Sequence, residues 1–224
     1  MYDNKENICF VHKGANRDKC KDVYFYKKSK YVRVIGLCDG VSTQKFSDIG
    51  AYEVQKSISD MLDEIEDFSE INEIDLKFKI GCVINETIFE LSKKYDCEEE
   101  SFASTLMLAI LPEGKDFYWT VHIGDGVIGL VDNNYEVRIL SNPENGITRQ
   151  YTYTTVSGNF MKRLRVKRHD ERGFIFLMTD GISNEIEDNQ SYLDYVKGMD
   201  WKGLENDLLS KNISDDIGFN GIMI

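Results

Sequence analysis

The chain has 224 residues and carries 39 acidic against 27 basic side chains, which gives a formal net charge of −12 at pH 7. Hydrophobic residues make up 42% and aromatic residues 12%, so the composition is that of a protein with a packed core and not of a disordered chain. The acidic excess argues against a surface for nucleic acid or anionic membranes, because such surfaces need unpaired positive charge.

Length, cysteine usage and apolar patterning give expectations about organisation. A chain of this length without a proline-rich linker predicts one domain over residues 1–224. The five widely spaced cysteines include no Cys-x-x-Cys pair, which is untypical of a disulfide scaffold or a zinc site. The N-terminus lacks the pattern of a signal peptide, and no apolar run approaches the ~18 residues that span a bilayer. We therefore expect a cytoplasmic protein with no membrane partner.

Strand and helix patterns follow one another in blocks. A predicted hairpin comes first and two long helical patterns follow it, with Asp75 as the expected N-cap of the second. A run of four strands comes next, and the chain closes with one strand, a helical pair and a last short strand. The predicted strands are 23–26, 31–38, 105–111, 117–123, 127–131, 136–140, 173–178 and 222–224, and the predicted helices are 48–68, 75–95, 191–197 and 201–211. This order predicts an α+β fold in which helices pack outside mostly antiparallel sheets.

Three mostly apolar runs each end in an Asp-Gly pair: Asp39-Gly40, Asp125-Gly126 and Asp180-Gly181. A single Asp-Gly pair is typical of a hairpin turn. Three such pairs after apolar runs suggest carboxylates gathered at one sheet edge, where they repel one another unless a cation neutralises them. Their oxygen atoms suit Mg²⁺ or Mn²⁺. From spacing alone, a cation site and simple turns are equally good interpretations.

Other catalytic patterns are absent from the sequence. It contains no Gly-x-Ser-x-Gly elbow and no Gly-x-x-x-x-Gly-Lys phosphate loop. Its three histidines are scattered, and His122 falls inside a predicted strand. We therefore expect His122 to be a packed or hydrogen-bonded core residue rather than a catalytic one.

Six short motifs follow one another along nearly the whole chain. They are Gly14-Ala-Asn-Arg17-Asp-Lys-Cys-Lys21-Asp22, Asp39-Gly40-Val41, Ala103-Ser-Thr-Leu106, Ile123-Gly-Asp125-Gly126, Thr179-Asp180-Gly181-Ile182 and Asp215-Asp216-Ile217-Gly218. In this order they resemble the metal-dependent protein phosphatases of type 2C, the PPM family, and in particular its bacterial branch. The resemblance implies a four-layer α-β-β-α sandwich with two central antiparallel sheets.

The resemblance also implies a metal site made of carboxylates. Asp39 would bridge two Mn²⁺ or Mg²⁺ ions, and the carbonyl of Gly40 would bind one of them. Asp180 and Asp215 correspond to the carboxylates on the second ion. Asp22 corresponds to the aspartate at or beside the metal shell.

The activity implied by the resemblance is hydrolysis of phosphoserine and phosphothreonine in proteins that a Ser/Thr kinase has phosphorylated. A hydroxide that bridges the two ions would attack phosphorus, and Arg17 would hold the phosphate through its planar guanidinium. Asp125 corresponds to a carboxylate associated with a third, weaker ion in bacterial members.

Lys21 departs from the family pattern, because most members carry Glu or Gln there. Its ammonium would either weaken cation binding or point outward, and the Ser42-Thr43 pair replaces a Gly-Gly turn. Two alternatives to an active phosphatase follow. One is a catalytically impaired pseudophosphatase that binds phosphoproteins as a regulatory module, and the other is an unrelated binding domain whose Asp-Gly pairs are only turns.

Overall fold

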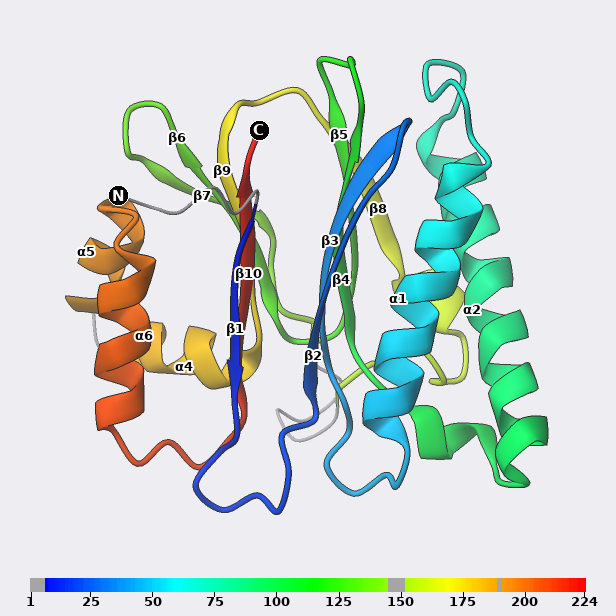
Figure 1. The fold of residues 1–224 in the computed structure, drawn as a ribbon, viewed down its shortest axis with the longest axis horizontal. Helices are drawn as coiled ribbons and strands as arrows, with labels where there is room; N and C mark the ends of the chain where they lie inside the picture. Colours follow the sequence, from blue (N-terminus) through cyan, green and yellow to red (C-terminus); the bar gives the residue numbers. More distant parts are fainter. Residues whose placement is uncertain (1–6, 145–151, 189–190) are drawn as a thin grey trace.

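The computed structural model describes residues 7–144, 152–188 and 191–224. Its centre consists of two five-stranded antiparallel sheets (Figure 1). Sheet A contains, in spatial order, β1 (Asn7–His12), β10 (Ile217–Met223), β9 (Gly173–Met178), β6 (Val127–Asp132) and β7 (Val137–Ser141). Sheet B contains β2 (Asp22–Lys28), β3 (Val32–Asp39), β4 (Leu106–Pro112), β5 (Tyr118–Ile123) and β8 (Arg165–His169).

Helices cover the outer faces of both sheets (Figure 1). The helices are α1 (Ser47–Asp63), α2 (Glu73–Tyr95), the 3₁₀-helix η1 (Glu99–Phe102), α3 (Phe160–Arg163), α4 (Asp180–Asp188), α5 (Ser191–Lys197) and α6 (Trp201–Ser210). The pair α1 and α2 packs on sheet B, and α4 to α6 pack on sheet A. The chain is therefore an α-β-β-α sandwich, and the predicted fold class is confirmed.

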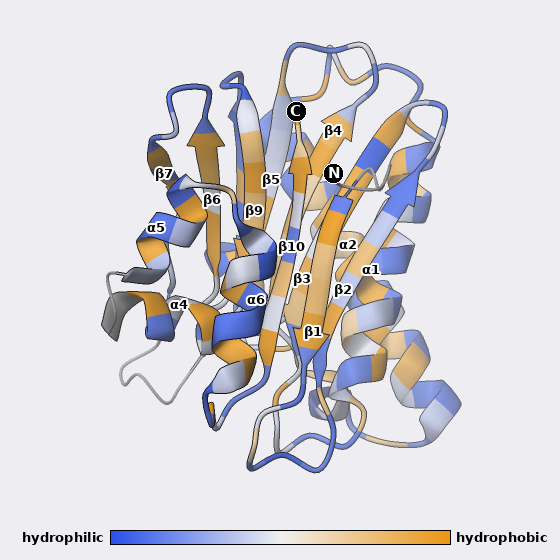
Figure 2. Ribbon diagram, turned by 60° about the vertical axis from the view of Figure 1, so that its left-hand side comes forward, coloured by the Kyte–Doolittle hydropathy of each residue, from blue (hydrophilic) through white to orange (hydrophobic). Residues whose placement is uncertain are grey.

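Three layers of buried side chains hold the sandwich together. The central layer lies between the sheets and includes Leu37, Met107 and Leu177. A second layer joins sheet B to α1 and α2, and a third surrounds Trp201 beneath α6. Figure 2 shows the inner strands as mostly hydrophobic, whereas the outer helices alternate between hydrophobic and hydrophilic residues. This pattern is the one expected for helices that bury a single face. In the described part of the chain, no helix has the length and apolar character needed to cross a membrane.

Local hydrogen bonds set the helix limits that the sequence misplaces. The predicted helix 48–68 ends at Asp63, where the amides of Glu64 and Ile65 bond to the carbonyls of Met61 at 3.3 Å and Leu62 at 3.1 Å, three residues back instead of four. The N-cap of α2 is Asn72 and not Asp75. The Asn72 side chain accepts a hydrogen bond from the amide of Asp75 at 2.9 Å, so Asp75 already lies inside the first turn.

Strands β1 and β8 and helices α3 and α4 have no counterpart among the predicted elements. The predicted closing strand 222–224 is longer in the structure, where β10 begins at Ile217. Gly218 and Gly221 hide the strand pattern there, because glycine has low strand propensity. Within β10, the side chain of Asn220 donates hydrogen bonds to the carbonyls of Phe25 and Gly36, both at 2.9 Å. These bonds join sheet A directly to sheet B.

Candidate active site

One edge of the sandwich gathers the aspartates that the motifs single out. Asp22 begins β2 and Asp39 ends β3, and the antiparallel register places them directly opposite each other. Asp125 follows β5, Asp180 follows β9, and Asp215 precedes β10. The segments that follow β1, β3 and α6 all lie at the lower edge of the molecule in Figure 1. Carboxylates from both sheets therefore lie at the same end of the molecule.

Most of the predicted site residues line one cavity of about 650 Å³. Its lining includes Arg17, Asp39, Asp125, Asp180 and Asp215. The loop after Asp39, the segment 152–158 and the residues Glu100, Ala103 and Thr105 supply the remaining walls. The two other predicted residues lie next to Asp39. Asp22 is its cross-strand partner, and Gly40 is the next residue in the chain.

Asp22 is the most deeply buried of these carboxylates, with 5% of its surface exposed. The hydroxyl of Thr179 donates a hydrogen bond to its Oδ2 atom at 2.7 Å, whereas its buried Oδ1 atom has no partner. Burial raises the pKa of Asp22 well above its usual range, and the nearby carboxylates add to this effect. An unpartnered buried carboxylate oxygen is the kind of atom that a proton or a cation satisfies.

The pKa values of Asp39 and Asp180 are raised for the same reasons. Burial raises the pKa of Asp39 well above its usual range, and repulsion from Asp22 and Asp180 raises it further. Burial also raises the pKa of Asp180 to about 7, with further contributions from Asp125 and Asp215. The cluster therefore carries more potential negative charge than it can hold without a compensating positive charge.

We expect the metal-free protein to lose stability as the pH rises through neutrality. The pKa of Asp180 is 3.8 in its reference state and about 7 in the fold. A carboxyl whose pKa is raised by folding contributes its full stabilisation at a pH below its pKa in the unfolded chain. This contribution is lost as the pH rises through its pKa in the folded protein. In EDTA, the melting temperature should therefore fall by a few degrees between pH 5.5 and pH 8. Asp180→Asn should flatten this slope, and an equal slope in the variant would contradict the assignment.

The guanidinium of Arg17 is bound to Asp215. Its Nε atom donates to Asp215 Oδ1 at 3.2 Å, and its Nη2 atom donates to the same oxygen. This hydrogen bond is the main reason that the pKa of Arg17 is raised. Gly14 permits the arrangement, because a Cβ atom at this position would lie 2.5 Å from the backbone of Asp215. The side chain of Asp216 holds the segment from Gly14 to Lys21 in place. It accepts hydrogen bonds from the amide of Gly14 at 2.8 Å and from the amide of Lys21 at 2.7 Å.

Several polar partners of these residues were not predicted from the sequence. The hydroxyl of Thr152 donates to Asp125 Oδ2, and it opposes the rise in the pKa of Asp125 that burial causes. The hydroxyl of Thr105 accepts a hydrogen bond from the amide of Asp39 at 2.8 Å. Thr105 lies in the motif Ala103-Ser-Thr-Leu106, whereas nothing in the sequence around Thr152 indicates its role.

His122 has a structural environment, as the sequence predicts. It is 1% exposed, its Nδ1 atom lies 2.8 Å from the hydroxyl of Ser141, and the side chain of Arg165 approaches the same atom at 2.9 Å. Burial holds the pKa of His122 well below its usual range, and Arg165 contributes to this effect. A neutral imidazole enclosed in this way fills the core.

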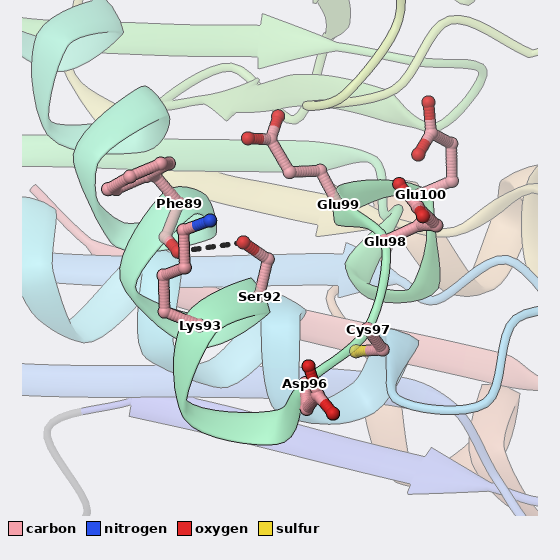
Figure 3. A pocket seen from close by; sticks show the side chains of 8 residues that line it. All are labelled: Phe89, Ser92, Lys93, Asp96, Cys97, Glu98, Glu99 and Glu100. Atoms are coloured by element: carbon pink, nitrogen blue, oxygen red, sulfur yellow. Dashed lines mark hydrogen bonds between the residues drawn. The ribbon is translucent and has the colours of Figure 1, made fainter.

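A second cavity, of about 500 Å³, lies at the C-terminal end of α2. In Figure 3, Glu98, Glu99 and Glu100 gather on one side of it, and Phe89 and Lys93 lie on the helix opposite. Glu100 lines both cavities, so the two hollows share a wall. Both cavities contain acidic side chains and one basic side chain, Lys93 in the second and Arg17 in the first. The first cavity differs because it gathers the aspartates of the sequence motifs. We therefore place the candidate active site in the first cavity.

The carboxylate cluster fits hard divalent cations by its chemistry. The buried Oδ1 atom of Asp22 lacks a partner, and the pKa values of Asp22, Asp39 and Asp180 are all raised. All of these donors are oxygen atoms, which Mg²⁺ and Mn²⁺ prefer. In the described residues, no three acidic, histidine or cysteine side chains have the spacing of a formed metal site. Two of the carboxylates are bound to other side chains in the structure, Asp215 to Arg17 and Asp125 to Thr152.

Comparisons with known proteins point to one family. Residues 12–216 match the family described as Protein phosphatase 2C. No curated protein sequence matches the chain. The fold resembles several solved structures at low sequence identity.

The serine/threonine phosphatase of S. agalactiae has a TM-score of 0.75 at 18% identity, with 98% of this chain and 99% of that chain covered. The serine/threonine phosphatase Stp1 of Staphylococcus aureus has a TM-score of 0.69 at 16% identity, with coverages of 98% and 94%. RsbX, solved in complex with magnesium, has a TM-score of 0.64 at 9% identity, with coverages of 97% and 94%.

Proposed function

Because the chain belongs to the protein phosphatase 2C family, we propose that it hydrolyses phosphoserine and phosphothreonine in proteins and depends on divalent cations. The observation that carries this proposal is the cavity in which Arg17 faces carboxylates supplied by both sheets. The phosphorylated proteins would be products of a Ser/Thr kinase, and the reaction would take place in the cytoplasm.

Six residues would hold the cations of the proposed site. Asp39, the carbonyl of Gly40 and Asp22 would hold one Mn²⁺ or Mg²⁺ ion, and Asp39, Asp180 and Asp215 would hold a second. Asp125 would serve a third, weaker ion. When bound, ions of this class lower the pKa of a water molecule, so that hydroxide is available to attack phosphorus at neutral pH. They also neutralise charge on the phosphoryl oxygens.

Arg17 would bind the phosphate of the substrate. Its guanidinium lines the cavity and already binds one carboxylate oxygen through two nitrogen atoms. The same two donors suit a pair of phosphate oxygens. In the structure Asp215 accepts from both donors, so a phosphate would replace this carboxylate as their acceptor.

A second candidate is a phosphoprotein-binding module without turnover. One observation favours it: the ion pair of Arg17 and Asp215 joins a proposed phosphate ligand to a proposed metal ligand. A cation would have to displace Arg17 from Asp215 before the second ion could bind, and without that ion the site would not turn over its substrate.

Hydrolysis of a phosphothreonine peptide and of p-nitrophenyl phosphate, with Mn²⁺, with Mg²⁺ and with EDTA, tests the proposal. We expect turnover with at least one of the two cations and no turnover in EDTA, because the cation neutralises the carboxylate cluster and activates the attacking water. Calorimetry should show Mn²⁺ binding under the same conditions. Binding without turnover would favour the phosphoprotein-binding module, and neither binding nor turnover would contradict both candidates.

A further inference from the structure

The backbone of Lys21 is fixed between two parts of the site. Its amide donates to Asp216 Oδ2 at 2.7 Å, and its carbonyl accepts a hydrogen bond from the amide of Gly40 at 3.2 Å. Lys21 also directly precedes Asp22 in the chain. The direction of its side chain therefore decides whether a positive charge lies in the acidic cluster or elsewhere.

The side chain of Lys21 turns to the loop that follows Gly40. Its ammonium donates to the carbonyl of Ser42 at 2.8 Å, to that of Val41 at 3.3 Å and to that of Gln44. An ammonium has three N–H groups, so each group has a carbonyl acceptor. Three carbonyl dipoles that converge on one point create a negative potential, which a positive charge at that point stabilises.

The loop of residues 41–44 forms part of the wall of the cavity. Val41, Ser42 and Gln44 all line it beside Asp39. The hydroxyl of Ser47 also donates to the carbonyls of Val41 at 3.0 Å and Gln44 at 3.3 Å. The loop is therefore folded around donors that lie inside it, and Lys21 supplies the only charged one in the described structure.

We propose that Lys21 is a positioning residue whose ammonium serves as the built-in cation of the loop 41–44. This inference rests on the proposed function, because the loop is the wall that a phosphorylated peptide meets beyond its phosphate group. Lys21 acts through the loop and not through the ions. Lys21, whose departure from the family pattern suggested weaker cation binding, is thereby a part of the substrate-binding surface.

The variants Lys21→Met and Lys21→Glu, with Lys19→Met as a matched control, test the proposal. Lys19 is exposed and pairs with Asp48 at 2.8 Å, so its removal deletes the same charge two residues away without touching the loop carbonyls. Hydrogen–deuterium exchange of the segment 41–46 should become faster in both Lys21 variants and stay unchanged in Lys19→Met. Lys21→Glu should show the faster exchange of the two, because its carboxylate would face three carbonyl oxygens.

Kinetics separate a positioning role from a merely structural one. In Lys21→Met, KM for the phosphothreonine peptide should rise about tenfold while kcat stays within about twofold. Turnover of p-nitrophenyl phosphate, which does not extend to the loop as a peptide does, should change by less than about twofold. Mn²⁺ affinity should change no more than in Lys19→Met. Lys21→Arg, which keeps the charge and the donors, should recover most of the peptide KM.

Rescue gives a readout that general destabilisation would not produce. In Lys21→Ala, millimolar propylammonium should lower the peptide KM again, because it returns an ammonium to the carbonyls. Unchanged exchange in Lys21→Met, an equal loss for both substrates, or higher activity in Lys21→Glu than in Lys21→Met would overturn the proposal. If the unmodified protein shows no turnover, the proposed function fails, and loop exchange alone then decides whether Lys21 holds the loop.

Discussion

Asp39→Asn is expected to reduce metal-dependent hydrolysis by about a thousandfold or more and to stabilise the metal-free protein. The loss of activity follows because Asp39 is the carboxylate proposed to contact both ions. The gain in stability follows because Asp39 lies opposite Asp22 and near Asp180, and this repulsion and burial raise its pKa well above the usual range. A neutral amide of the same shape removes the repulsion, so the melting temperature in EDTA should rise by a few degrees at pH 7.5.

The matched control is Asp96→Asn. Asp96 lines the second cavity and has a φ of 50°, a left-handed conformation that asparagine accepts readily. This control should change neither the activity nor the melting temperature in EDTA. If Asp39→Asn retained activity, or if Asp96→Asn lost it, the assignment of the active site to the first cavity would be wrong. A lower melting temperature of Asp39→Asn in EDTA would contradict the electrostatic argument separately.

Replacing Arg17 should separate phosphate binding from metal binding. Arg17→Met is expected to lower kcat/KM for the phosphothreonine peptide by about a hundredfold or more, since two hydrogen bonds to a charged phosphate would be lost. The affinity for Mn²⁺ should be retained or increased, because Asp215 loses the cation that now binds it. Steady-state kinetics and calorimetry on the same preparation measure both quantities.

Arg17→Lys is the informative companion variant. It keeps the positive charge but loses the planar pair of donors, so it should recover only part of the lost kcat/KM. A variant in which Mn²⁺ binding fell together with activity would show that Arg17 acts by positioning Asp215 and not by holding phosphate. Equal activity in Arg17→Lys and the unmodified protein would show that charge alone suffices.

Much of the architecture can be predicted from the sequence because periodicity and burial agree there. The long helices α1 and α2 and the inner strands have apolar positions that match the period of one element type. The strand β8 is different, since its exposed Lys167 and Arg168 give it the pattern of a charged surface segment. Edge strands tolerate such residues, and pairing with β5 defines the strand instead.

The site follows the same division. The aspartates Asp39, Asp125 and Asp180 can be found because each follows an apolar run. Alternate strands of an antiparallel sheet run the same way, so β3 and β5, which flank β4, end at the same edge. The pairing of Thr152 with Asp125 and the direction of the Lys21 side chain cannot be found this way. Both depend on contacts between segments that are distant in the chain, and local patterns carry no information about them.

The division of the carboxylates between the two sheets has a mechanical consequence. Asp22 and Asp39 are attached to sheet B, whereas Asp180 and Asp215 adjoin strands of sheet A. A slide of one sheet over the other would therefore pull the cluster apart, even if every strand and helix stayed intact. The buried amide of Asn220 opposes this slide, because it binds carbonyls of β2 and β3 from within β10. Alignment at the edge that carries the proposed site thus depends on an asparagine in the interior of the sandwich, which belongs to none of the acidic motifs.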